Sequence, residues 1–77
     1  MKVTLKFSRA LRGIYKHLDE EMEITLEAGA TARDALLAAN FIEGTWGVLI
    51  TGDRLCRANE ELEDGQEIMV LPPVSGG

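Results

Sequence analysis

The sequence predicts an α+β fold, a mixed four- to five-stranded sheet with one main helix on one face. Three observations carry this prediction. Two early segments alternate apolar and polar residues as strands do, alanines and a leucine then recur at helical spacing, and shorter strand-like segments follow. The 77 residues suffice for one domain. We place this domain at residues 1–71 and an extended tail at residues 72–77.

The first two strands are predicted from strict alternation, because successive side chains of a strand point to opposite faces of its sheet. Segments 3–8 and 22–27 both alternate in this way. The residues expected to face the core are Val3, Leu5, Phe7, Met22, Ile24 and Leu26. We expect an antiparallel hairpin whose long connection, residues 9–21, contains a short helical turn.

The main helix is expected to begin after Thr31. The Thr31 hydroxyl can accept a hydrogen bond from a first-turn amide, and the short acid Asp34 is favourable near the positive helix end. The helical spacing is carried by Ala32, Ala35, Leu36 and Ala39. Asn40 suits a left-handed end of the helix. Phe41 and Ile42 are expected to fold back onto the core.

The second half reads as a hairpin followed by a last strand. Segments 48–51 and 54–56 flank Gly52-Asp53, where a glycine supplies the positive φ that a two-residue turn needs. Residues 59–64 are polar apart from Leu62 and suggest a short turn of helix. The last strand, residues 66–71, is apolar on both faces, which is typical of a central strand. We expect it to pair in parallel with the first strand.

Composition and charge exclude several classes of protein. The net charge is −5, and a net acidic chain is a poor nucleic-acid binder that better suits a basic protein surface. No apolar run approaches the roughly 20 residues of a membrane helix. Cys56 is the single cysteine and cannot form an internal disulfide, which fits a reducing compartment. With Met1 leading directly into strand-like sequence, we expect a cytoplasmic protein.

The tail has a composition suited to chemistry at its terminal carboxylate. Pro72 and Pro73 cannot donate to a strand ladder, so they end the sheet and hold the backbone extended. Val74 and Ser75 are small, and the chain ends with Gly76 and Gly77. Activation of a carboxylate by ATP gives an acyl-adenylate that sulfur or nitrogen nucleophiles can attack. Two terminal glycines leave the carbonyl uncrowded inside a narrow channel of another protein.

Four segments together resemble the MoaD/ThiS family of β-grasp, ubiquitin-like sulfur carriers. The most specific is the ending Leu71-Pro72-Pro73-Val74-Ser75-Gly76-Gly77, which is similar to the tail of molybdopterin synthase small subunits. Segment 48–53 resembles a strand and turn in which Asn-Gly is more usual than Thr51-Gly52. Segment 62–68 resembles Leu-x-Asp-Gly-Asp-x-Val, with Gln66 in place of Asp. Segment 29–31 resembles the entry to the family's helix.

This resemblance implies a carrier rather than an enzyme. An adenylating activating enzyme would use ATP on Gly77, and a sulfur donor such as a cysteine desulfurase or a rhodanese would convert it to a thiocarboxylate. Pro72 to Gly76 would insert into a partner, the molybdopterin synthase large subunit or another acceptor enzyme. The carrier itself would bind no cofactor. The short segment between Thr31 and Gly52 is closer to the thiamine type, so thiamine synthesis, tRNA thiolation and protein modification remain alternatives.

Several other residues are candidates for chemistry or docking. Phe7, Ile68 and Val70 are candidates for docking the partner through a sheet face, although a core position also fits them. Cys56 is expected to be a small core residue rather than a nucleophile. One histidine, His17, makes a poor metal site, and no metal is expected. Two charged groups could each be a solvated surface or a partner contact: Arg9, Arg12 and Lys16, and Glu60, Glu61, Glu63 and Asp64.

Overall fold

The computed structural model describes residues 1–16, 18–42 and 45–73 of the chain. The elements in these ranges are β1 (Lys2–Phe7), α1 (Arg9–Ile14), β2 (Glu21–Thr25), α2 (Ala32–Ala38), β3 (Leu49–Thr51), β4 (Arg54–Cys56) and β5 (Glu67–Val70). The predicted strands and the main helix are therefore confirmed. Nowhere in the described ranges is a helix both long and apolar enough to cross a membrane.

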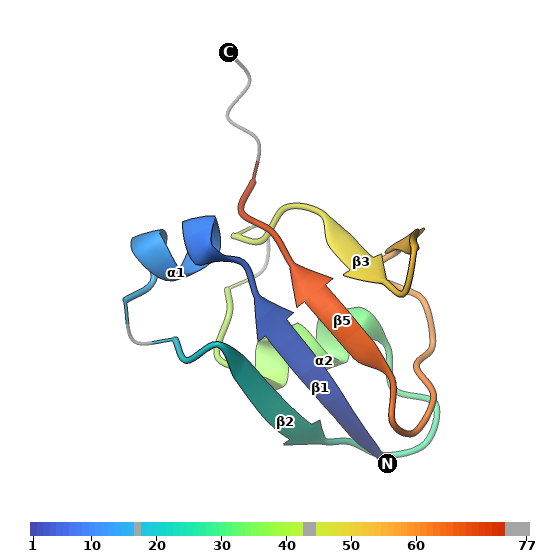
Figure 1. Ribbon diagram of the computed structural model, residues 1–77. Coiled ribbons are helices and arrows are strands. Elements are labelled where there is room, and N and C mark those ends of the chain that lie inside the picture. Colours follow the sequence, from blue (N-terminus) through green and yellow to red (C-terminus); the bar gives the residue numbers. More distant parts are fainter. Residues whose placement is uncertain (17, 43–44, 74–77) are drawn as a thin grey trace.

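The strands form one mixed sheet in the order β2-β1-β5-β3-β4 (Figure 1). Strand β1 pairs antiparallel with β2, which confirms the predicted hairpin, and parallel with β5. Strand β3 pairs antiparallel with both β5 and β4. The first and last strands thus lie side by side in the sheet, as expected from the apolar residues on both faces of β5.

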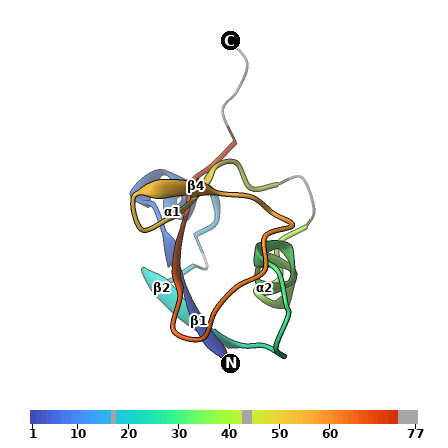
Figure 2. The same cartoon turned by 90° about the vertical axis from the view of Figure 1, so that its right-hand side faces the viewer.

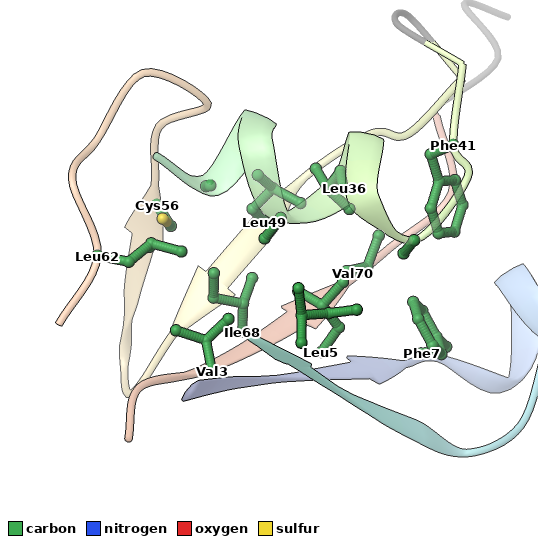
Figure 3. Packing of buried hydrophobic residues seen from close by; sticks show 14 of the residues in the cluster. Val3, Leu5, Phe7, Leu36, Phe41, Leu49, Cys56, Leu62, Ile68 and Val70 are labelled. Atoms are coloured by element: carbon green, nitrogen blue, oxygen red, sulfur yellow. The ribbon is translucent and has the colours of Figure 1, made fainter. Parts of the chain in front are cut away.

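Helix α2 covers one face of this sheet (Figure 2). The side chains of Val3, Leu5, Ile68 and Val70 point from the central strands toward this helix, and Leu36 meets them from above (Figure 3). Each of these five side chains is at most 1 % exposed. The hydrophobic core therefore lies between the sheet and α2, and burial of its apolar surface is the main source of stability.

The connection between β1 and β2 contains the predicted helical turn as the helix α1. Ser8 is its N-cap, and the Ser8 hydroxyl accepts a hydrogen bond from the Leu11 amide at 3.1 Å. Leu11 is fully buried, so it anchors the short helix to the core. Ser8 also donates its backbone N–H to the Val70 carbonyl at 3.1 Å, which joins the start of α1 to the end of β5.

Both ends of α2 form as the sequence predicts. Thr31 and Asp34 make a reciprocal capping box, and Asn40 has a left-handed backbone with φ of 69°. Phe41 folds back onto the core, where its ring lies 5.7 Å from that of Phe7. The same expectation for Ile42 is wrong, because its side chain is 75 % exposed. The left-handed turn at Asn40 reverses the chain once, which directs Phe41 inward and leaves its neighbour outside.

The helical turn expected within residues 59–64 is also wrong. Asn59 and Asp64 lie in separate turns, and between them the chain crosses the start of α2, where the amides of Ala32 and Arg33 donate to the carbonyls of Glu60 and Ala58. These amides belong to the first turn of α2 and have no partner within their own helix. Pairing them holds the segment open, while Leu62 donates to Ala30 and is buried as predicted.

The turn between β3 and β4 has the predicted geometry. Gly52 adopts a φ of +63°, a left-handed conformation that is costly for residues with a Cβ atom. Leu49 faces Cys56 across the hairpin, and both side chains are buried. Ile50 and Leu55 are likewise opposite each other, and therefore point to the face of the sheet away from α2.

Candidate functional site

The chain leaves the sheet at Leu71, directly after β5. The Leu71 amide donates to the Val48 carbonyl at 2.9 Å, and the Gly47 amide donates to the Leu71 carbonyl at 2.9 Å. Pro72 and Pro73 come next and have no N–H to continue this pairing. Figure 1 shows this point beside α1 and the segment leading into β3. The predicted end of the ladder at the prolines agrees with these hydrogen bonds.

Most of the predicted tail lies outside the described residues. Pro72 is half-buried and Pro73 is exposed. Val74, Ser75, Gly76 and Gly77 are outside the described ranges, so their roles stay predictions, as does the division of the chain after residue 71. The structure shows the residue before the tail, Leu71, which is held by hydrogen bonds to Val48 and Gly47.

The predicted docking residues are in the core, which corrects their assignment as partner contacts. Phe7 is 3 % exposed, and Ile68 and Val70 are fully buried. Figure 3 shows all three among the side chains between the sheet and α2. The physical reason is the orientation of the sheet, since α2 covers the face to which these residues point. A partner cannot reach them while the fold is intact.

The opposite face of the sheet carries another apolar surface, which we call the open-face row: Ile50, Leu55 and Met69. Ile50 pairs with Leu55 on one side and with Met69 on the other. Leu55 is 68 % exposed, and Ile50 and Met69 are partly exposed. A shallow hollow beside the row is lined by Lys6, Ile50, Gly52, Glu67 and Met69. Exposed apolar surface of this kind is typical of interaction sites.

The open-face row was not identified among the site residues predicted from sequence. The signal for this surface is present in the alternation of the hairpin. Leu49 and Cys56 point to one face of the sheet, and Ile50 and Leu55 point to the other. Alternation separates the two faces without saying which one a helix covers. The short hairpin is apolar on both faces at these positions, so the sequence pattern left the choice open.

Charged residues border the open-face row and the exit of the chain. Lys6 lies 3.5 Å from Glu67 in an exposed ion pair on the central strands. Arg12 donates from Nε to the Phe7 carbonyl at 3.3 Å, and Arg9 is exposed. A hollow here is lined by both signs of charge, with Lys6, Arg9 and Arg12 opposite Glu20 and Glu21. Of the basic group predicted from sequence, Arg9 and Arg12 therefore lie near the exit, close to acidic neighbours.

The acidic run does not adjoin the exit of the chain. Asp64 accepts a hydrogen bond from the Lys2 amide at 2.7 Å, at the beginning of β1. Since β1 and β5 are parallel, this is the end of the sheet opposite Leu71. Glu60 holds Arg54 through two hydrogen bonds of 2.9 and 2.8 Å, and this contact lowers the pKa of the Glu60 carboxyl and raises that of the guanidinium.

Cys56 is in the core, as predicted. Its side chain is buried, and burial raises the pKa of the thiol, with Glu60 adding to the effect. A protonated, covered sulfur is a poor nucleophile. His17 lies outside the described residues. Within ranges 1–16, 18–42 and 45–73, no three His, Cys, Asp or Glu side chains are arranged to hold a metal ion.

Comparisons with known proteins agree on one family and one fold. The model of the ThiS family matches residues 10–77. A Pyrococcus furiosus protein provisionally assigned as molybdopterin converting factor, subunit 1, is 30 % identical, with a TM-score of 0.73 over 96 % of this chain and 99 % of that one. No curated protein matches the sequence.

Two further solved structures share the fold at lower identity. SAMP1 from Haloferax volcanii is 18 % identical, with a TM-score of 0.73 over the full length of both chains. A structure of H. volcanii small archaeal modifier protein 1 is 16 % identical, with a TM-score of 0.71 over 95 % of this chain and 98 % of that one. These likenesses confirm the predicted ubiquitin-like β-grasp fold, including β1, which precedes the residues of the family match.

Proposed function

Because the chain belongs to the ThiS family, whose members are small ubiquitin-like sulfur carriers or modifiers, we propose that it carries sulfur for the synthesis of molybdopterin, the pterin of the molybdenum or tungsten cofactor. The observation that carries this proposal is the 30 % identity to the P. furiosus protein over 96 % of the chain. The family match, which runs through the terminal glycines to residue 77, supports it.

The proposed chemistry takes place at the carboxylate of Gly77. One carboxylate oxygen attacks the α-phosphorus of ATP in an activating enzyme, which forms an acyl-adenylate and releases pyrophosphate. The outer sulfur of a persulfide on a desulfurase or a rhodanese then attacks the carbonyl carbon, and AMP leaves with the electrons of the broken C–O bond. A thiol then attacks the donor's inner sulfur in the resulting acyl disulfide: the S–S bond breaks, a disulfide forms between this thiol and the donor, and the thiocarboxylate remains on Gly77.

The chain's own part in this scheme is to deliver the acyl group. Gly76 and Gly77 place no Cβ atom near the carbonyl, which leaves the path of the nucleophile open. Pro72 and Pro73 stiffen the first part of the tail, so less conformational entropy is lost when it enters a partner. In this proposal the chain supplies the terminal carboxylate and later its sulfur, while the catalytic groups belong to the activating enzyme and to the acceptor, the synthase large subunit.

The open-face row is the proposed docking surface for these partners, in place of the buried Phe7, Ile68 and Val70. Its apolar centre is bordered by the charged Lys6 and Glu67, the pattern of an interface with an apolar core and a polar rim. Leu71 follows β5 on the same side as Met69 by strand alternation. A partner on the open face therefore sits next to the exit of the tail.

Intact-mass spectrometry after incubation with the activating enzyme, ATP and a sulfur donor tests the proposal. We expect the full chain to gain the mass difference of one sulfur for one oxygen, localised to the last residue. The matched control ends at Ser75 and should keep its fold but gain no sulfur. Loading of this shortened chain would contradict the proposal, as would a full chain that never changes mass.

A second experiment, which follows the sulfur from the loaded carrier to an acceptor, separates the alternative functions. Loaded carrier is mixed with the synthase large subunit and a pterin precursor, and formation of the dithiolene product is measured. Sulfur transfer only to a thiamine or tRNA pathway enzyme would retain the carrier role and change the acceptor. Linkage of the chain to lysines of other proteins would identify a modifier, a role for which the likeness to modifier structures under 25 % identity supplies only the fold.

A further inference from the structure

The backbone that follows β5 passes in direct contact with Gly47. The Gly47 amide donates to the Leu71 carbonyl, and Leu71 donates back to the Val48 carbonyl, both at 2.9 Å. These bonds extend the β3–β5 pairing by one step beyond the strands. Pro72 and Pro73 then cross Gly47, so the point where the tail begins is set by the segment leading into β3.

This crossing leaves no room for a side chain at residue 47. A Cβ atom built on Gly47 would lie 2.2 Å from the Pro72 carbonyl oxygen, 2.6 Å from its carbon and 2.7 Å from Cα of Pro73. Non-bonded carbon atoms pack at about 3.5–4.0 Å, so these contacts are impossible without movement. All three atoms are backbone, and the proline rings restrict the dihedral angles through which that backbone could move away.

The glycine is required here for space and not for its backbone conformation. Gly29, Gly52 and Gly65 have positive φ, whereas Gly47 does not. In contrast, a Cβ atom at any of those three glycines would meet no atom within 4 Å. The absent side chain of Gly47 therefore has one structural consequence, the close passage of Pro72 and Pro73.

We propose that Gly47 is a positioning residue that seats the Pro72–Pro73 backbone and thereby sets the direction in which the tail leaves the fold. The inference rests on the proposed function, because direction matters only if the terminal residue must reach a partner's site. Two consecutive prolines form a stiff segment. A displacement at its base is therefore carried outward to the residues that follow it.

The test compares Gly47→Ala with Gly13→Ala, which adds the same methyl group where no atom lies within 4 Å. The rate of amide hydrogen exchange at Leu71 reports whether the Pro72–Pro73 backbone keeps its position against Gly47, since the Leu71 N–H is bonded to the Val48 carbonyl. The Thr4 amide, bonded to the Gln66 carbonyl at the other end of the sheet, serves as the internal reference for folding. The rate of thiocarboxylation with the activating enzyme, with kcat and KM measured separately, reports how well the tail places Gly77 in the site of that enzyme.

For Gly47→Ala we expect faster exchange at Leu71, unchanged exchange at Thr4, and a loss of about 10- to 100-fold in kcat/KM for loading, as expected for a misplaced reacting group. The loss should fall mainly on kcat, because the open-face row is unaltered. Gly13→Ala should behave as the unsubstituted chain. Normal Leu71 exchange in Gly47→Ala, or faster exchange with normal loading, would overturn the inference.

A second variant keeps the inference testable if Gly47→Ala does not fold. Replacing both Pro72 and Pro73 by glycine adds no heavy atom near Gly47 and removes the stiffness, and the Leu71 bonds should remain. We expect slow Leu71 exchange with reduced loading, and unreduced loading would contradict the proposed positioning. Failure of the unsubstituted chain to load would instead reject the proposed function, while the Leu71 exchange would still report whether Gly47 seats the prolines.

Discussion

Ile68 and Met69 are neighbours in β5 with opposite environments. Ile68 is fully buried against α2, whereas Met69 is partly exposed in the open-face row. Both are apolar residues of similar size, so their side chains alone do not distinguish the roles. Position in the strand decides them, because adjacent side chains point to opposite faces.

Truncating each of these residues should therefore have different effects. Ile68→Ala leaves a cavity in the core and is expected to lower the free energy of unfolding by about 2–5 kcal/mol. Met69→Ala, on the face away from α2, is expected to cost less than about 1 kcal/mol. Urea unfolding followed by circular dichroism measures both. Equal losses would contradict the assignment of the two faces.

At the scale of elements, α2 is held at its start by two independent sets of bonds. Thr31 and Asp34 form the capping box, with Asp34 accepting from the Thr31 backbone amide at 2.9 Å. Glu60 and Ala58 accept from the next two amides of the helix. The first set is readable in the sequence, whereas the second comes from a segment more than 20 residues away and exists only in the folded chain.

The capping box makes the stability of α2 depend on pH. Hydrogen bonds from Thr31 favour the carboxylate and lower the pKa of Asp34 below its ordinary value. A carboxyl with a lowered pKa stabilises the fold above its unfolded pKa, and this contribution is lost as the pH falls through the folded pKa. We expect Asp34→Ala to lower Tm at neutral pH and to approach the unsubstituted chain in strong acid.

Thermal melts between neutral pH and the acid range below the ordinary pKa of aspartate measure this effect. The matched control is Glu27→Ala, which removes an exposed carboxylate outside the capping box. Its difference from the unsubstituted chain should not follow the same pattern. An Asp34→Ala difference that stays constant down to the lowest pH would show that the charge of Asp34 plays no part.

At the scale of the molecule, all strands and both helices contribute to one core. The buried cluster includes Leu11 of α1, Leu36 of α2 and side chains from β1, β2, β3, β4 and β5. The parallel β1–β5 pair joins the two ends of the described chain at the centre of the sheet. Loss of either end therefore exposes the whole core, which favours cooperative unfolding.

We expect a single unfolding transition in urea. Trp46 is the single tryptophan and packs against the core next to Gly47, so its fluorescence reports the region where the tail begins. Far-ultraviolet circular dichroism reports the sheet and helices. The two signals should share one midpoint and one slope. Separate midpoints would show that the Trp46 region unfolds on its own.

Much of the fold could be predicted because its determinants are local. Alternation from Val3 to Phe7 marks β1, the Thr31–Asp34 pair marks the start of α2, and Gly52 marks the hairpin turn. Each signal depends on residues a few positions apart. The error at residues 59–64 concerned a segment whose state depends on distant partners at the start of α2, whereas the error at Ile42 concerned which residue after the left-handed turn at Asn40 points inward.

The candidate site also has one part that the local sequence reveals and another that depends on contacts between distant residues. The prolines and terminal glycines of the tail are visible in the sequence and led to the sulfur-carrier hypothesis. The docking candidates Phe7, Ile68 and Val70 are buried, which the sequence left open because β5 has apolar residues on both faces and either set could have been covered. No local pattern in the sequence singles out Gly47, since its close contact joins it to Pro72, 25 positions later in the chain.

The sequence by itself determined the elements, their order and the family to which the chain belongs, because alternation, capping and turn residues act over a few neighbours. Only the tertiary structure decided which face of β5 is buried and why residue 47 has no side chain. The physical reason is that both depend on what packs there: α2 covers Ile68 and leaves Met69 exposed, and the Pro72 backbone occupies the space beside Gly47.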